Sequence, residues 1–385
     1  MVATTADQRR GSGLGAAVAG MLLTAATYGM ARFGVGLFAP RLGAQRPDLT
    51  DVLGWAAAAQ FTSYALAGAV AARLVDRRPR TGLVLAGATS TAGCLGVAVA
   101  SDPVVFVVAV FIGGMGGGFA SPALVPVIDA VVARRATATA QSVVNSGTAV
   151  GVIGAGVVAS VAASTGPAWA FMALVCAVTA VAAWYPVRAR TDLAAPTTEP
   201  SSGSWRLLVV PGVAAVVAGA GSALIWTFGP LLATESGSVS ADRVGWLWIA
   251  LGVGGMLGAL TGVVVERWGR RGGWVLCAGV LALAGAGLAW SVVAVSAWAA
   301  YAGMAFFGAG YMGLSGVLVL WARQVWPDAT GAGTSVLFIA LAIGQALGSA
   351  GFGIIRDAVS PGPLALLAAG LCVLGGLVAL IRTSR

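Results

Sequence analysis

Long apolar segments alternate along this chain with short polar ones. A helix that spans a membrane needs about 20 predominantly apolar residues, and segments of that kind fall into two groups of six, separated by a polar stretch. The pattern predicts an all-α membrane protein with twelve transmembrane helices. The predicted helices are residues 14–40, 51–72, 81–100, 103–127, 138–163, 167–187, 206–232, 243–265, 273–296, 298–321, 331–355 and 362–382.

The polar stretch, residues 188–205, is rich in Thr, Pro and Ser and too polar to enter a membrane. It divides the chain into an N-terminal six-helix half (1–187), a linker (188–205) and a C-terminal six-helix half (206–385). The halves also resemble one another in sequence, since Phe-Ala-Pro at 38–40 matches Phe-Gly-Pro at 228–230. Repeated halves of this kind are a transporter design in which the substrate binds between them.

Composition and charge support a membrane protein and predict its orientation. Of 385 residues, 58% are hydrophobic and 9% are charged, against about 25% charged in soluble domains. All 22 basic residues are Arg; 17 lie in one alternating set of loops, 4 in the other, and Arg32 lies within a helix. The bias places both termini in the cytoplasm. Because the arginines form short clusters and not one basic surface, the net charge of +9 does not indicate nucleic-acid binding.

Several kinds of chemistry are absent from the sequence. The chain has no His, its four Cys are widely spaced, and no Asp or Glu lies in the middle of a predicted helix. We find no nucleophile–base pair and no metal-ligand cluster, so we expect neither an enzyme nor a cofactor or metal. The glycines at 113–118 indicate close helix packing and not a phosphate loop, since the chain has no Lys. We expect a monomer embedded in the lipid bilayer.

Tryptophans gather near both ends of the predicted helices, as expected for two belts at the level of the lipid headgroups. Trp226 lies further in, so it belongs either to a belt or to the wall of a central cavity.

One loop carries a family resemblance. Residues 262–271 read GVVVERWGRR, which resembles the signature loop of the major facilitator superfamily, with Glu in place of the usual Asp. Residues 72–80 form a degraded first-half counterpart. The segment Tyr-Gly-Met-Ala-Arg-Phe at 28–33 is similar to the opening of a poorly characterised bacterial branch of that superfamily.

The resemblance implies a conformational latch at the cytoplasmic ends of the helices. In such proteins the acid of the loop faces a helix start, and its basic residues hold an acid at the inner end of the fourth helix. The matching positions here are Asp76, Arg77, Asp129, Glu266, Arg267, Arg270 and Arg271. The second half has no acid near the inner end of the tenth predicted helix, so its latch looks incomplete. The alternative is that these charged residues only set the orientation of the helices in the membrane.

Arg32 is the charge that stands out, since a lone Arg at that depth costs about 3 kcal/mol unless it meets water, a partner or a ligand. Thr24, Tyr28 and Arg32 recur every four residues and so would share one face of an α-helix. An Arg beside Tyr and Thr suits a small anion, an aromatic or another carboxylate. The alternative is that Arg32 extends toward the surface or braces its helix.

The superfamily resemblance implies that helices 1, 4, 7 and 10 line a central cavity. By pseudo-symmetry Ser222 occupies the position of Arg32, with Trp226 one turn further out. Tyr311 and Gln345, which are polar and lie in the middle of their segments, are second-rank candidates.

Three functions therefore remain open from the sequence. The first is a secondary transporter that moves a small organic solute, with an anion favoured, by alternating access. The second is an exporter of apolar drugs or metabolites, and the third is a ligand sensor with a transporter fold.

Overall fold

The computed structural model describes residues 3–74, 78–133, 136–188, 206–326 and 330–381. Within these ranges the chain is helical and contains no strand. The first half comprises α1 (Ala3–Thr24), the π-helix η1 (Ala25–Arg32), α2 (Gly34–Gln45), α3 (Pro47–Asp51), α4 (Leu53–Leu74), α5 (Pro79–Val99), α6 (Pro103–Val131), α7 (Thr137–Val161), α8 (Thr165–Trp184) and η3 (Tyr185–Val187). The second comprises α9 (Arg206–Glu235), η4 (Ala241–Arg243), α10 (Val244–Gly255), η5 (Met256–Leu260), α11 (Thr261–Ala294), α12 (Ala297–Val325), α13 (Thr330–Ile355) and α14 (Pro361–Val378).

Ten helical segments of the described chain are long and apolar enough to cross a membrane. One of them, residues 241–294, contains two of the predicted helices, because Gly269 leaves helical geometry (φ 69°, ψ 170°). The chain reverses there, since Gly273 packs against Val265. α4 is long enough to span but is less apolar, since it contains Gln60 and Tyr64 among other polar residues. With these two additions the described helices match the twelve predicted ones.

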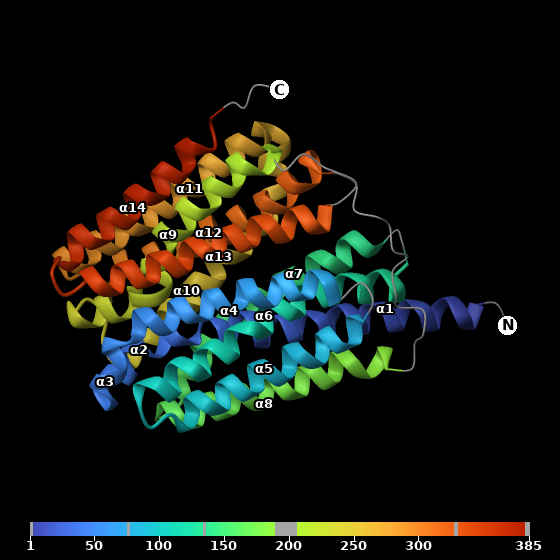
Figure 1. The fold of residues 1–385 in the computed structure, drawn as a ribbon, viewed down its shortest axis with the longest axis horizontal. Helices are drawn as coiled ribbons and strands as arrows, with labels where there is room; N and C mark the ends of the chain where they lie inside the picture. The colour runs from blue at the N-terminus through green and yellow to red at the C-terminus, as the bar shows by residue number, and fades with distance from the viewer. Residues whose placement is uncertain (1–2, 75–77, 134–135, 189–205, 327–329, 382–385) are drawn as a thin grey trace.

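The helices form two bundles that lie side by side, α1–α8 in blue to green and α9–α14 in yellow to red (Figure 1). α1 begins and α14 ends toward the same end of the molecule (Figure 1), which we call the terminal end; the opposite end is the distal end. A chain that crosses a membrane an even number of times begins and ends on the same side.

The two halves use the same packing device. Gly151 of α7 lies against the backbone of Ala25 in the first spanning helix, and Gly344 of α13 lies against the backbone of Val216 in α9. Small residues allow helix backbones to approach this closely in a membrane. Each half therefore joins its fifth helix tightly to its first.

The glycines at 113–118 pack as predicted from the sequence. A Cβ at Gly93 of α5 would collide with the backbone of Gly113, one at Gly114 with the Gln60 carbonyl of α4, and one at Gly117 with the Tyr28 ring of η1. α6 thus offers a flat surface to three neighbouring segments, which confirms close packing as the reason for these glycines.

The two halves are in close contact toward the distal end. A Cβ at Gly54 of α4 would lie 2.8 Å from the carbonyl oxygen of Ser349 on α13, nearer than Cβ atoms approach in real structures. Gly36 of α2 lies even more tightly against the carbonyl of Trp226 on α9. Residues close to these contacts form the site described next.

The predicted tryptophan belts hold only in part. Trp55, Trp246, Trp268, Trp290 and Trp298 are exposed, whereas Trp169, Trp248, Trp274, Trp321 and Trp326 are buried within the bundle. The expectation was wrong for the buried five because a position near a helix end does not reveal which face of the helix carries the side chain.

Candidate functional site

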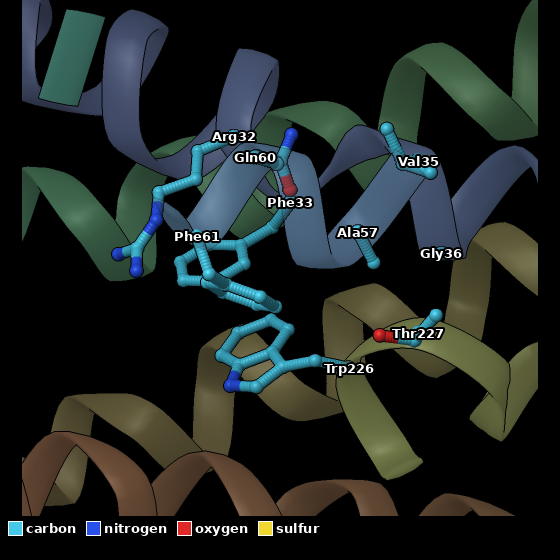
Figure 2. A pocket seen from close by; sticks show the side chains of 9 residues that line it. All are labelled: Arg32, Phe33, Val35, Gly36, Ala57, Gln60, Phe61, Trp226 and Thr227. Carbon is cyan, nitrogen blue, oxygen red and sulfur yellow. The ribbon is translucent and has the colours of Figure 1, made fainter. Parts of the chain in front are cut away.

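Arg32 lies at the centre of the molecule, between the two halves, with only 1% of its surface exposed. It is the last residue of η1, and α4 of its own half and α9 of the other half pack around it (Figure 2). The side chains surround a small cavity. The space in which the centre of a water molecule can lie measures about 10 Å³, so the cavity has room for about one water. The lining residues are Arg32, Phe33, Val35, Gly36, Ala57, Gln60, Phe61, Trp226 and Thr227 (Figure 2).

The guanidinium group of Arg32 is only partly satisfied. Its Nη2 donates a hydrogen bond to Oε1 of Gln345 at 3.2 Å, and this bond joins the first half to α13 of the second. Its Nε and Nη1 are buried and have no hydrogen-bond partner among the described residues. The ion pairs of the described chain form at Arg46 and Arg356 and do not include Arg32. A buried cation thus retains two unused donors.

Aromatic rings surround this cation. Its central carbon lies 3.9 Å from the ring centroid of Tyr64, 4.5 Å from Tyr28, 4.9 Å from Phe33 and 5.1 Å from Phe61. The negative faces of aromatic rings attract cations, by up to about 2 kcal/mol where the pair is desolvated. These rings stabilise the charge of Arg32 without neutralising it.

Gln345 links Arg32 to a second candidate residue. While its oxygen accepts from Arg32, its Nε2 donates to the hydroxyl of Tyr311 at 3.1 Å. The structure therefore brings Arg32, Gln345 and Tyr311, from three different helices, into one hydrogen-bonded chain.

Tyr28 and Tyr64 close the terminal side of Arg32. Their rings meet edge to face at 5.5 Å, and the Tyr28 hydroxyl donates to the Tyr64 hydroxyl at 3.1 Å. The Tyr28 ring also lies on Gly117 of α6, where a Cβ would come within 2.8 Å of it. A residue larger than Gly at 117 would displace this ring.

Trp226 is buried in the centre and not in a belt. Its ring stacks on that of Phe33 at 3.7 Å and 9°, and it meets Trp248, Phe307 and Tyr311 edge on. Its Nε1 is buried with no hydrogen-bond partner in the described part of the chain. Trp226 thus adds a third unused donor near the cavity.

Two predicted residues lie away from this arrangement. The Cβ of Thr24 packs against Gly147 of α7, and Ser222 donates a hydrogen bond to the Gly219 carbonyl of its own helix at 2.8 Å. The shared face expected for Thr24, Tyr28 and Arg32 holds for the last two only. Thr24 precedes the π-helix formed by residues 25–32, in which i→i+5 hydrogen bonds replace those of an α-helix, whereas the other two residues lie within it.

The sequence analysis missed several residues of the site. Phe33 and Phe61 went unremarked, although Phe33 directly follows Arg32. Gln60 and Tyr64 are polar residues in an Ala-rich helix, and this polarity is the sequence feature that could have identified them. π-Helical turns are frequent at functional sites, but no sequence feature marked this one.

Part of the predicted latch lies outside the described residues, namely Asp76 and Arg77. Asp129 is exposed near the end of α6, and Glu266 and Arg267 are exposed in α11. Their role in a latch stays a prediction.

The second loop has contacts within its own half. Arg270 donates to Oε1 of Gln324 at 2.9 Å, and Arg271 donates to the carbonyl of Ile381 at 3.2 Å. Gln324, near the end of α12, thus accepts a hydrogen bond where the sequence offers no acid. These contacts tie α11 to α12 and to the residues that follow α14.

The site as a whole offers donors and ring faces. Arg32 and Trp226 can donate hydrogen bonds and cannot accept them, and Phe33, Phe61 and Trp226 supply the aromatic part of the wall. Such a surface favours a ligand that carries negative charge and hydrogen-bond acceptors.

Comparisons with known proteins agree on the fold. A family model described as Major Facilitator Superfamily matches residues 21–349. The structure is similar to that of the nucleoside transporter NupG, with a TM-score of 0.74, 11% identity, and coverage of 95% of this chain and 99% of that one. It is also similar to the xylose transporter XylE from E. coli in a partially occluded inward-open conformation, with a TM-score of 0.72, 17% identity and coverage of 96% of both chains. Among curated protein sequences, none matches this chain.

Proposed function

This chain belongs to the Major Facilitator Superfamily of secondary transporters for small solutes, and we propose that it carries a small organic anion, with Arg32 binding the negative charge. Movement of the two halves about this site would expose it to each side of the membrane in turn. The observation that carries the proposal is the state of Arg32, which is buried between the halves and, among the described residues, has two donor nitrogens without a partner and no carboxylate partner.

A structural role for Arg32 would have a different signature. An arginine that braces a protein interior is generally paired, because an unpaired buried charge is costly. Within the described part of the chain, the hydrogen-bond acceptor of Arg32 is a single amide oxygen. A carboxylate ligand would fill the unused donors with charge-assisted hydrogen bonds, each worth about 1.5–3 kcal/mol.

We also propose that the terminal end faces the cytoplasm. The loops predicted at this side hold 17 of the 22 arginines, and α1 begins and α14 ends toward it (Figure 1). A reporter fused to the C-terminus that reads as periplasmic would contradict this orientation.

The proposal is tested by measuring ligand affinity and melting temperature on the same variants. A panel of organic carboxylates, each paired with its neutral amide, is applied to purified protein. Arg32→Ala should lower carboxylate affinity by about tenfold or more, since loss of one charge-assisted hydrogen bond has this effect. Arg32→Lys keeps the charge but not the planar fork, so its loss should be smaller.

Arg41→Ala is the matched control. Arg41 follows on the same spanning helix and donates to the carbonyl of Ala162 at 2.8 Å, away from the cavity. Its replacement should lower the melting temperature and leave affinity unchanged. Unaltered carboxylate affinity in a well-folded Arg32→Ala protein would contradict the anion site and favour an apolar solute.

A further inference from the structure

Trp226 is held by its own half and covered by the other. Trp248, Phe307 and Tyr311, all from the second half, meet its ring edge on at 73–84°. Phe33, from the first half, lies flat on its face with ring centroids 3.7 Å apart. The edge contacts fix the plane of the indole, whereas the flat contact crosses the boundary between the halves.

The charge of Arg32 lies at the margin of this stack. Arg32 and Phe33 are neighbours in sequence, and the guanidinium carbon is 4.9 Å from the Phe33 ring centroid. Separation of the halves would move Phe33 and Arg32 away from Trp226 and uncover the indole face beside a cation. A flat ring that carries one carboxylate matches both features.

We infer that the transported solute is a planar aromatic monocarboxylate, whose ring replaces Phe33 on Trp226 while its carboxylate binds Arg32. This inference rests on the proposed anion function and narrows it to one chemical class. Arg32 is the one charged residue among those that line the cavity, so a second carboxylate would have no cation to pair with and would be costly to bury.

The test uses four probes that differ in one property each. Benzoate has the flat ring and the charge, cyclohexanecarboxylate has the charge without the flat ring, benzamide has the ring without the charge, and phthalate has two charges. Affinity is measured by competition on the purified full-length protein. Benzoate should bind about twofold to tenfold more tightly than cyclohexanecarboxylate, the range for an aromatic stacking contact. Phthalate and benzamide should bind more weakly than benzoate.

Trp226→Leu should remove the preference for benzoate over cyclohexanecarboxylate. The control is Trp298→Leu, because Trp298 is 85% exposed on the outside of the bundle, and it should leave the preference unchanged. If Trp226→Leu does not fold, the comparison of benzoate with cyclohexanecarboxylate on the unmodified protein still decides whether the site prefers a flat ring.

The outcomes separate the inference from the proposed function. Equal affinity for benzoate and cyclohexanecarboxylate, or a preference that survives in Trp226→Leu, would overturn the aromatic inference and leave the anion carrier standing. Benzamide binding as tightly as benzoate would overturn both. Failure of both carboxylates to bind a cooperatively melting protein would also overturn both.

Discussion

Arg32 and Arg356 lie in the same molecule in contrasting surroundings. Arg356 follows α13 near the distal end, where its Nη2 lies 3.7 Å from Glu235 and its Nε lies 3.2 Å from Asp357. Arg32 lies deeper, at the centre, and its polar partner there is the neutral amide of Gln345. The described residues thus provide carboxylates for an arginine at the edge of the bundle and none for the more deeply buried one.

The difference teaches how a structural arginine and a binding arginine can be told apart. Both are partly shielded by rings, since Arg356 lies 5.5 Å from the ring centroid of Phe228. The presence of a ring beside the cation therefore does not separate the two arginines. The distinction lies in whether the protein itself supplies the negative charge.

The comparison can be sharpened by disturbing the rings around Arg32 and leaving its charge in place. In Gly117→Ala the new Cβ would lie 2.8 Å from the Tyr28 ring, so the ring must move. A side chain forced off its rotamer costs about 0.5–1.5 kcal/mol, which corresponds to about a twofold to tenfold loss of anion affinity. Gly370→Ala, which has open space around it, should leave affinity unchanged; equal affinities in the two variants would show that the position of Tyr28 does not matter for binding.

A smaller effect is expected when the paired arginine is removed. Arg356→Ala should lower the free energy of unfolding by about 1 kcal/mol or less, as is typical for a partly exposed ion pair. Anion affinity should not change, because Arg356 does not line the cavity. Denaturation and anion binding, measured on one preparation, check the change in stability and the unchanged affinity. A marked fall in affinity would show that Arg356 also contributes to anion binding and would contradict the contrast between the two arginines.

Much of the fold could be predicted from the sequence because a membrane imposes length and polarity on each helix. The twelve segments and the glycine packing of residues 113–118 followed from apolar runs and small residues alone. Arg32 was also evident, since a charge within an apolar segment is costly. Gln345 and Tyr311 were visible as polar residues, but not as neighbours of Arg32.

The remaining features depend on contacts between distant parts of the chain. Gln345 lies 313 positions from Arg32, and no local pattern pairs them. The π-helix at 25–32 was not evident either, and the assumption of α-helical spacing misplaced Thr24. Phe61 and Tyr64 belong to the site because their rings reach from α4 to the guanidinium group of Arg32, which follows from the tertiary fold and not from helix periodicity.

The most direct test of the account supplies the missing carboxylate from within. Gln345→Glu places an acid at the oxygen that now lies 3.2 Å from Arg32, with nearly the same shape. If Arg32 binds the anionic solute, this internal carboxylate should compete with it, lowering carboxylate affinity by about tenfold or more while the melting temperature is kept or raised. Gln345→Leu, which removes the amide without adding charge, should keep carboxylate affinity at or above the original value. Carboxylate affinity in Gln345→Glu within about twofold of the unmodified protein would contradict the claim that Arg32 awaits an anion.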